Sequence, residues 1–170
     1  MSEENYGEDN LVDALTSRGR DWPCLQQFVV FLENKVGSLH QLLRTVERDD
    51  LMIVGLSIQD SADSSTARVI TNSYERTREI LELSGLPFCE SEVIGVLLPD
   101  VAEPLTNVCG SLMSAELNVH YVYPLLYRRN GRGAVAIFVD DLDESLRVLK
   151  ERNHDFVTED DLLEYDGLYE

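Results

Sequence analysis

The predicted order of strands and helices occurs twice along this chain, and that repeat limits the fold more than any other feature. From about residue 25 to residue 93, the apolar patterns predict a strand, a helix, two strands, a helix and a strand. The same β-α-β-β-α-β order follows up to residue 158, with little residue identity between the copies. Each copy is a split β-α-β unit. We therefore expect an α+β protein with two tandem ferredoxin-like domains, each an antiparallel sheet with helices on one face.

The repeat divides the chain into four parts. We expect an N-terminal extension over 1–24, a first domain over 25–92, a second over 93–158 and an acidic C-terminal tail over 159–170. The last strand of the first copy and the first strand of the second meet at Val93, so they can run on as one strand. The tail can cover an edge, cover a face or be disordered, and the sequence favours none of these.

The N-terminal extension is one candidate for covering the open face of a sheet. The extension has apolar residues at helical spacing, which allow a short amphipathic helix: Leu11, Val12, Ala14 and Leu15. A sheet with helices on one face must bury its other face too. The candidates are the other copy, the extension and a second chain.

Local signals fix several turns and helix starts. Asn72 followed by Glu75, and Asp141 followed by Glu144, have the spacing of a capping box at a helix start. Asn130-Gly131 lies between two strand patterns and predicts a tight hairpin, because both residues tolerate positive φ.

Composition excludes several function classes. The 32 acidic and 14 basic residues give a net charge of −18. Nucleic acids and anionic membrane surfaces both require a basic surface, so we expect neither as a partner. No apolar run is long enough to span a bilayer, and the N-terminus is acidic rather than a signal peptide. The three widely spaced cysteines do not suggest a disulfide framework, which indicates the reducing cytoplasm.

The turn after the first strand is the best candidate for a binding site. The apolar run from Phe28 breaks at Asn34, bends at Gly37 and enters a helix at Ser38. The first amides of a helix have no partner within it and lie at its positive end. Such an end binds small anions. We therefore expect this turn to hold the carboxylate of a small molecule, and an amino acid is the natural candidate.

At these residues the chain resembles the ACT domains, small ligand-binding modules of amino-acid metabolism. Their pattern is a strand, Asp or Asn, any residue, Pro, Gly, any residue and Leu, followed by a helix, with Asn-Ile opening the next strand. The segment Asn34-Lys35-Val36-Gly37-Ser38-Leu39 matches it, with Val36 in place of Pro. The second copy reads Asp100-Val101-Ala102-Glu103-Pro104-Leu105, with Glu103 in place of Gly, and Asn118-Val119 fits the Asn-Ile pair. The resemblance covers residues 25–158 and is greatest to stand-alone bacterial proteins made of two ACT domains.

The resemblance implies that the glycine turn of one domain faces the second strand of its neighbour. It would pair the intact turn with Asn118, and Glu103 with Met52, where the Asn of the motif is missing. A carboxylate at Glu103 repels a ligand carboxylate and prevents the close backbone approach that Gly allows. We therefore expect one amino-acid site per chain, with the second site lost.

The expected ligand-binding residues are those of the intact turn and its facing residue: Asn34, Lys35, Val36, Gly37, Ser38, Leu39 and Asn118. Turn amides would bond the carboxylate, and an asparagine oxygen would accept from the ammonium. Taken without the resemblance, Gly37 simply makes a tight turn that Asn34 caps. On the later strand, Tyr121 and Tyr123 are expected to share a face with Val119 and Leu125, either as core or as lining of the ligand pocket.

Catalysis has no support in the sequence. The three histidines (His40, His120 and His154) are scattered over different elements, so neither a metal site nor a cofactor is expected. The resemblance implies a non-catalytic amino-acid-binding regulator that acts in trans on a metabolic enzyme, such as acetolactate synthase, and forms a homodimer or higher homo-oligomer. The alternative is a structural or protein-interaction module with a vestigial ligand site.

Overall fold

The computed structural model describes residues 23–62 and 64–165. The helix predicted near Leu11 lies outside the described residues. The strands are β1 (Leu25–Glu33), β2 (Ile53–Asp60), β3 (Ser64–Thr71), β4 (Phe88–Leu97), β5 (Val119–Arg129), β6 (Arg132–Val139) and β7 (Asp155–Val157). The helices are α1 (Ser38–Val46), α2 (Tyr74–Ser84), α3 (Pro104–Met113), α4 (Leu142–Glu151) and α5 (Glu159–Leu163).

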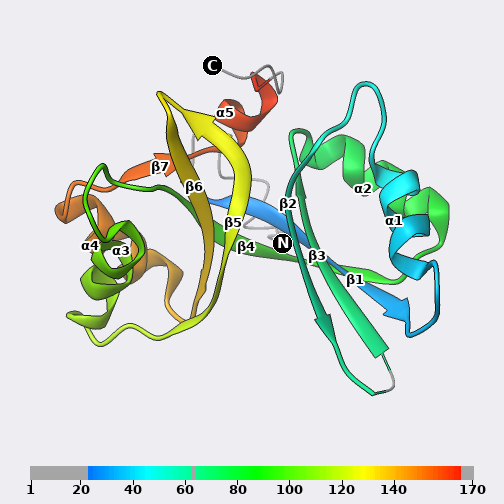
Figure 1. Cartoon of the computed structure of the whole chain (residues 1–170), viewed down its shortest axis with the longest axis horizontal. Helices are drawn as coiled ribbons and strands as arrows, with labels where there is room; N and C mark the ends of the chain where they lie inside the picture. Colours follow the sequence, from blue (N-terminus) through cyan, green and yellow to red (C-terminus); the bar gives the residue numbers. More distant parts are fainter. Residues whose placement is uncertain (1–22, 63, 166–170) are drawn as a thin grey trace, which may run out of the picture.

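Two β-α-β-β-α-β units stand side by side, as the repeat predicts. Helices α1 and α2 cover the outer face of one sheet, and α3 and α4 cover the outer face of the other (Figure 1). The helix-free faces of the two sheets turn toward each other and enclose a shared core. Each copy therefore covers the open face of the other, which was one of the three candidates for that role.

Strand β4 belongs to both units. Its first half, Phe88 to Val93, pairs antiparallel with β1. Its second half, Ile94 to Leu97, pairs with β6 on one side. On the other side, Gly95 to Leu97 pair with β7. The strand that ends the first unit is thus the strand that begins the second, without an intervening linker.

The two units meet again at a second junction, between β2 and β5. The only paired residues there are Gly55 and Leu125, and β2 has a register shift just before Gly55. A Cβ at Gly55 would lie 2.8 Å from Leu125 Cδ2 and 3.2 Å from the Tyr123 ring. The absence of a side chain therefore lets the two strands approach. Together with β4, this junction closes the strands into a ring, in the order β1-β3-β2-β5-β6-β4 and back to β1.

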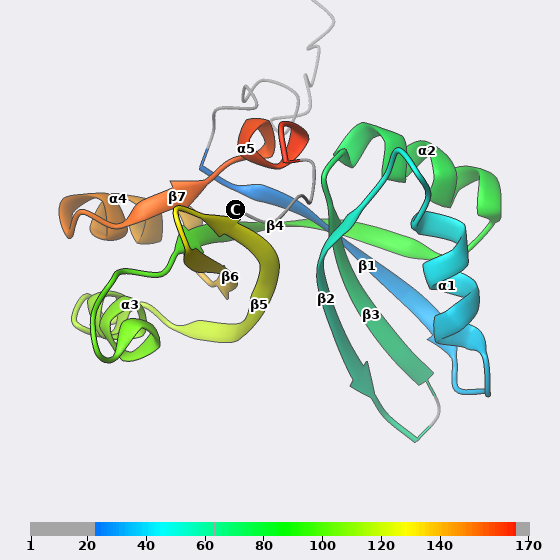
Figure 2. The same cartoon turned by 45° about the horizontal axis from the view of Figure 1, so that its top comes forward.

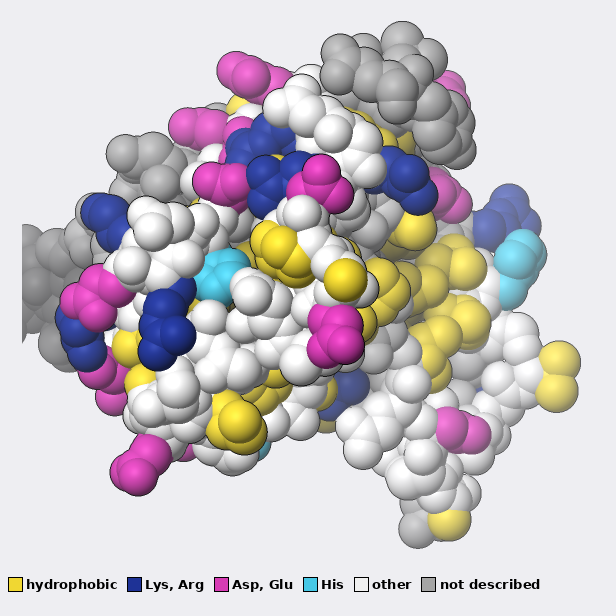
Figure 3. Space-filling model, turned by 60° about the vertical axis from the view of Figure 1, so that its left-hand side comes forward, with side chains coloured by type: hydrophobic (Ala, Val, Ile, Leu, Met, Phe, Trp, Pro, Cys, Tyr) yellow, Lys and Arg dark blue, Asp and Glu magenta, His cyan; other side chains and the backbone are white. Residues whose placement is uncertain are grey.

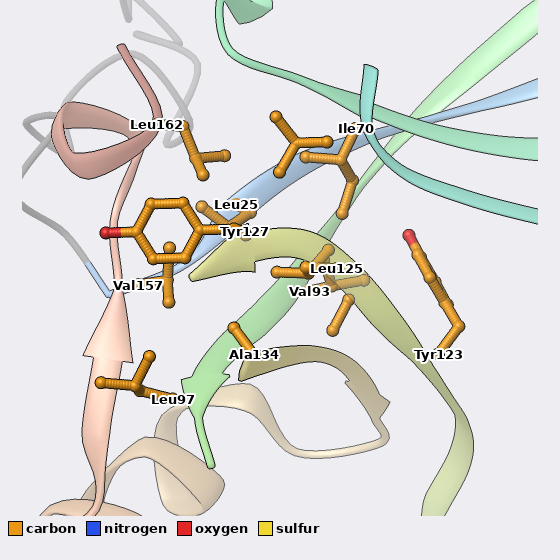
Figure 4. Packing of buried hydrophobic residues seen from close by; sticks show 12 residues of the cluster. Leu25, Ile70, Val93, Leu97, Tyr123, Leu125, Tyr127, Ala134, Val157 and Leu162 are labelled. Carbon is orange, nitrogen blue, oxygen red and sulfur yellow. The ribbon is translucent and has the colours of Figure 1, made fainter. Parts of the chain in front are cut away.

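The core inside this ring draws on both units. Its buried side chains come from β1 to β7 and from α5: Leu25, Val54, Ile70, Val93, Leu97, Tyr123, Leu125, Tyr127, Ala134, Ala136, Val157 and Leu162 (Figure 4). Leu162 of α5 is fully buried, and Tyr165 packs on the Tyr127 ring at 5.0 Å. Residues 159–165 of the acidic tail therefore cover one end of the shared core.

One polar network crosses this core. Gln27 of β1 is fully buried. Its Nε2 donates to Ser91 Oγ and to Tyr121 Oη, each at 2.9 Å, and its Oε1 accepts from Tyr123 Oη at 2.6 Å. The Arg68 guanidinium lies 4.2 Å from the centre of the Tyr121 ring. Buried hydrogen bonds of this kind favour one relative placement of the packed strands, because any other leaves a buried polar group unpaired.

Of the two predicted helix caps, one is confirmed and one is wrong. Asp141 caps α4 as predicted, accepting from the Glu144 amide at 3.0 Å. Asn72, however, does not cap α2, whose N-cap is Ser73. The Asn72 side chain instead accepts from the Met52 amide at 2.8 Å, which ties the end of β3 to the start of β2. The expected cap was wrong because this tertiary partner uses the side chain.

The face assigned to Val119 is also wrong. Tyr121, Tyr123 and Leu125 do pack in or against the shared core, whereas Val119 packs with the α3 and α4 side. A register shift between Val119 and Tyr121 reverses the alternation at that point. The predicted hairpin at Asn130-Gly131 forms, and both residues have positive φ.

Gly95 offers a test of the shared strand. A Cβ there would lie 2.8 Å from both Leu25 Cδ1 and the Val157 carbonyl oxygen, and the carbonyl belongs to rigid backbone. Gly95→Ala should therefore lower the free energy of unfolding by about 1 to 3 kcal/mol, as overpacking does. Chemical denaturation measures it. Gly110→Ala is the matched control, because a Cβ there meets nothing within 4 Å and Ala favours a helix, so it should not destabilise. Equal effects of both variants would refute the packing argument.

Tyr123 tests the polar network. Tyr123→Phe keeps the ring in the core but leaves the buried Gln27 oxygen without this donor. The expected loss is about 1 to 3 kcal/mol of unfolding free energy, the cost of a buried unpaired polar atom. In Tyr74→Phe, by contrast, the lost hydroxyl makes an exposed bond to Arg78, and the change should stay within about 0.5 kcal/mol. A neutral Tyr123→Phe would show that the network does not stabilise the domain pair.

Candidate ligand-binding site

The β1–α1 turn has the geometry that its sequence predicts. Gly37 is the N-cap of α1 with φ of 92°, in the left-handed region that glycine adopts at little cost. A Cβ at this position would meet nothing within 4 Å, and Val36 beside it is fully exposed. The turn is therefore open to solvent and not filled by the protein's own side chains.

Free donors are present at the start of α1. The Ser38 amide donates to the Lys35 carbonyl at 3.3 Å, and the Gln41 amide donates to the Gly37 carbonyl at 2.9 Å. The Leu39 and His40 amides between them donate to no backbone carbonyl among the described residues. Ser38 Oγ is shielded from solvent and also lacks a hydrogen-bond partner in that part of the chain. The two amides lie at the end of the helix that binds anions.

The other polar groups of the turn are already engaged. Asn34 Nδ2 donates to the Ser61 carbonyl at 3.2 Å, which ties the turn to the β2–β3 hairpin. Lys35 Nζ is paired with the Glu33 carboxylate, and this pairing holds the pKa of Glu33 below its usual value. Lys35 is therefore neutralised locally, and the backbone amides are the principal donors left for an anion.

Asn118 is not near this turn within one chain. The turn lies at the far end of the first unit, beside the β2–β3 hairpin, whereas Asn118 immediately precedes β5 in the second unit. Both views place these two segments at opposite sides of the molecule (Figures 1 and 2). Asn118 is exposed, and its carbonyl accepts from the Asp140 amide at 3.4 Å. A second chain is the only source from which Asn118 can reach the turn without rearrangement.

Of the other predicted pair, Met52 lines a groove between the two units, and Glu103 is not among the described residues that line it. This groove of about 1110 Å³ runs between the two units, over the outer side of β5. Met52 and Ile53 line it from the first unit, and Leu105 and Cys109 of α3 line it from the second. Hydrophobic side chains line the hollow between the two units (Figure 3). Glu103, two residues before Leu105, is the exposed N-cap of α3, with φ of −127° rather than the left-handed value of Gly37.

Sequence reasoning missed this groove for a physical reason. The strong curvature of β5 is visible only in three dimensions (Figure 2), and so is the way its outer side meets the α1–β2 corner. The one available signal was the equivalence of Met52 and Asn118 in the two copies. That equivalence compares residue types at matching positions of the two copies, and it does not predict how the two units are placed relative to each other.

A serine and a histidine also lie in contact, between α3 and the α4–β7 turn. Ser111 Oγ lies 2.9 Å from His154 Nε2 and donates to the Asn107 carbonyl at 3.0 Å. The histidine tautomer decides which of the two groups donates in this contact. The pair joins α3 to the turn between α4 and β7. No metal-binding group of three His, Cys, Asp or Glu side chains occurs among the residues that the structure describes.

His154 makes stability depend on pH. Burial, and then the charge of Arg152, lower its pKa below the usual value of about 6.5. Below about pH 6.5 the unfolded chain therefore binds more protons at this histidine than the folded chain does. The stability that the neutral histidine contributes is complete above about pH 6.5 and is lost as the pH falls toward the folded pKa. His154→Gln should therefore lose less unfolding free energy than wild type between pH 7.5 and 5.5, measured by urea denaturation. The matched control is His40→Gln, which removes an exposed histidine of α1 and leaves His154 in place, so the loss of stability that His154 causes should persist. Identical pH dependence in all three proteins would contradict the burial of His154.

Comparisons with known proteins agree with this architecture. Protein BT0572 from Bacteroides thetaiotaomicron has a similar crystal structure, with 25% identity and a TM-score of 0.75, over 84% of this chain and 98% of that one. The ligand-free regulatory subunit of aspartate kinase from Thermus thermophilus matches in fold, with 12% identity and a TM-score of 0.51, over 77% of this chain and 93% of that one. A comparison with curated protein sequences gave no match. In the described residues, none of the helices is both long enough and apolar enough to cross a membrane.

A family model described as an ACT domain pair matches residues 24–165. The match covers most of the chain and both of its units, and it supports a ligand-binding regulatory role. The protein belongs to the family of ACT domain pairs.

Proposed function

We propose that this protein is a non-catalytic regulator that binds a small amino acid at the β1–α1 turn and acts in trans on a metabolic enzyme. The observation that carries the proposal is the open turn at Gly37, with the free amides of Leu39 and His40 beside it. Membership of the ACT domain pair family supports a ligand-binding role. The resemblance offers the regulatory chain of acetolactate synthase as one example, and a solved protein of the same fold is a regulatory subunit of aspartate kinase.

The turn supplies the carboxylate half of such a site. Each bond from an amide to a charged carboxylate contributes on the order of 1.5 to 3 kcal/mol. The entropy cost of association offsets much of that gain, so we expect a Kd between about 1 μM and 1 mM. The ammonium of the ligand needs an acceptor, and in this proposal the Asn118 side chain of a second chain provides it.

Calorimetry with a panel of free amino acids tests the proposal. We expect one ligand per chain, and no binding to Gly37→Asp, because that change strains the left-handed turn and adds a negative charge where the carboxylate would lie. The matched control is Gly85→Asp, which makes the same substitution at another open glycine with positive φ (71°), at the C-cap of α2. It should bind as wild type does. Two equal sites per chain, or equal loss in both variants, would refute the proposed site.

Asn118→Ala tests the second half of the site. A clear loss of affinity with unchanged unfolding is expected if Asn118 of another chain accepts from the ammonium. Unchanged affinity would leave the turn as the whole site and would remove Asn118 from it.

A structural or protein-interaction module is the second candidate. The engagement of Asn34 and Lys35 inside the turn, and the distance of Asn118 in the same chain, favour it, because both leave the turn incomplete as a ligand site. Thermal shift against all amino acids separates the two candidates. A specific rise that Gly37→Asp abolishes supports the regulator, and no rise with any amino acid supports the interaction module.

A further inference from the structure

Helix α3 differs from the helices of similar length in its charge. Its sequence, and the two residues after it, contain no charged side chain over residues 104–115, in a chain of which 27% is charged. Helices α2 and α4 carry five charged residues each, and α1 carries one, Arg44. Loss of charge from an exposed helix is typical of a surface that meets another protein.

The exposed side of α3 is also apolar. Leu105, Cys109 and Met113 recur at every fourth position, so they form one stripe along the helix. Leu105 is 48% exposed and Met113 is 75% exposed, while Cys109 is half-buried. We call these three residues the α3 stripe.

Apolar residues of β5 extend the surface formed by the α3 stripe. Leu126 of β5 is 67% exposed, and it lines the interdomain groove together with Pro124 and two members of the α3 stripe. Yellow side chains continue from the front surface into the hollow on this side of the molecule (Figure 3). A continuous apolar surface of this kind on a soluble chain marks a site of association.

We propose that the α3 stripe packs antiparallel against the α3 stripe of a second copy of this chain. Two copies with a net charge of −18 each repel one another over most of their surfaces, so they can meet only where charge is absent. The α3 stripe is an uncharged surface of this kind. This inference does not rest on amino-acid binding at the β1–α1 turn.

The charges at the two ends of α3 favour the antiparallel arrangement. Glu103 is exposed at the start of the helix and makes no side-chain cap bond. Arg152 lies at the other end, where its Nη2 donates to Ser114 Oγ at 2.9 Å. Antiparallel packing brings Glu103 of one copy to Arg152 of the other, twice. Parallel packing would instead place Glu103 against Glu103.

In the antiparallel dimer, Cys109 lies at the centre of the contact. Cys109 is midway between Leu105 and Met113, so a two-fold axis through the stripe brings Cys109 of one copy to Cys109 of the other. Two cysteines can be joined when their Cα atoms lie about 4.4 to 6.8 Å apart. Cys89 is exposed on the other unit and Cys24 is buried, so each cysteine has a distinct environment.

Oxidative cross-linking tests the axis directly. Diamide takes two electrons and two protons from a pair of thiols, so a disulfide forms where two cysteines meet. We expect a covalent dimer from wild type and from Cys89→Ser, and its loss in Cys109→Ser. A dimer that persists in Cys109→Ser, or no covalent dimer at any protein concentration, would overturn the proposed axis.

Sedimentation velocity over a range of protein concentrations tests the surface. Met113→Asp should raise the dimer dissociation constant at least tenfold, and its unfolding should be unchanged because the side chain is mostly exposed. Leu83→Asp on α2 is the matched control, since Leu83 is 89% exposed and outside the stripe. It should dimerise as wild type. A monomeric wild-type chain, or a Met113→Asp dimer as tight as wild type, would overturn the proposal and leave the stripe to a different partner.

A charge exchange tests the direction of packing. Glu103→Arg and Arg152→Glu should each weaken the dimer, and the double variant should recover most of the wild-type dissociation constant. Failure of the double variant to recover, with both single variants weakened, would exclude the antiparallel contact.

Discussion

The continuity of β4 is the constraint on which the rest of the structure depends. Residues 88–93 complete the first sheet and residues 94–97 begin the second, so no linker allows the units to move apart. Gly95 lets Leu25 and the Val157 backbone approach that strand, and Gly55 lets β2 reach β5. Both strand junctions between the units thus depend on a residue without a side chain. The shared core and the Gln27 network then lie between two sheets whose relative placement the backbone already sets.

The relative placement of the two units decides which parts of the chain can form a common binding site. It leaves the β1–α1 turn at the outer end of the first unit and Asn118 at the far side of the second. It brings Met52 and Leu105 to one groove, although Glu103 makes the turn of the second unit unlike that of the first. A ligand at the open turn therefore does not bridge the two units of one chain. Regulation by such a ligand would have to act through a second chain, which gives the surfaces between copies their importance.

Much of the architecture could be predicted from the sequence, because strands, helices and their repeated order follow from local periodicity and turn chemistry. Gly37, Asp141 and Asn130-Gly131 all behave as their local preferences require. The errors arise where a distant partner intervenes. Asn72 bonds Met52 rather than capping α2, and the register shift before Tyr121 moves Val119 to the other face. The site could be predicted only as a turn, since the separation of Asn118 depends on how β4 joins the two sheets, and no local pattern encodes that relation.

Native-state hydrogen exchange tests most directly whether the two units form one cooperative structure. If β4 and the shared core hold them together, the slowest amides of β3 in the first unit and of β6 in the second open with the same free energy. Both values should then equal the global free energy of unfolding and fall together with denaturant. Two separate opening free energies, with one unit exchanging while the other stays protected, would contradict the account.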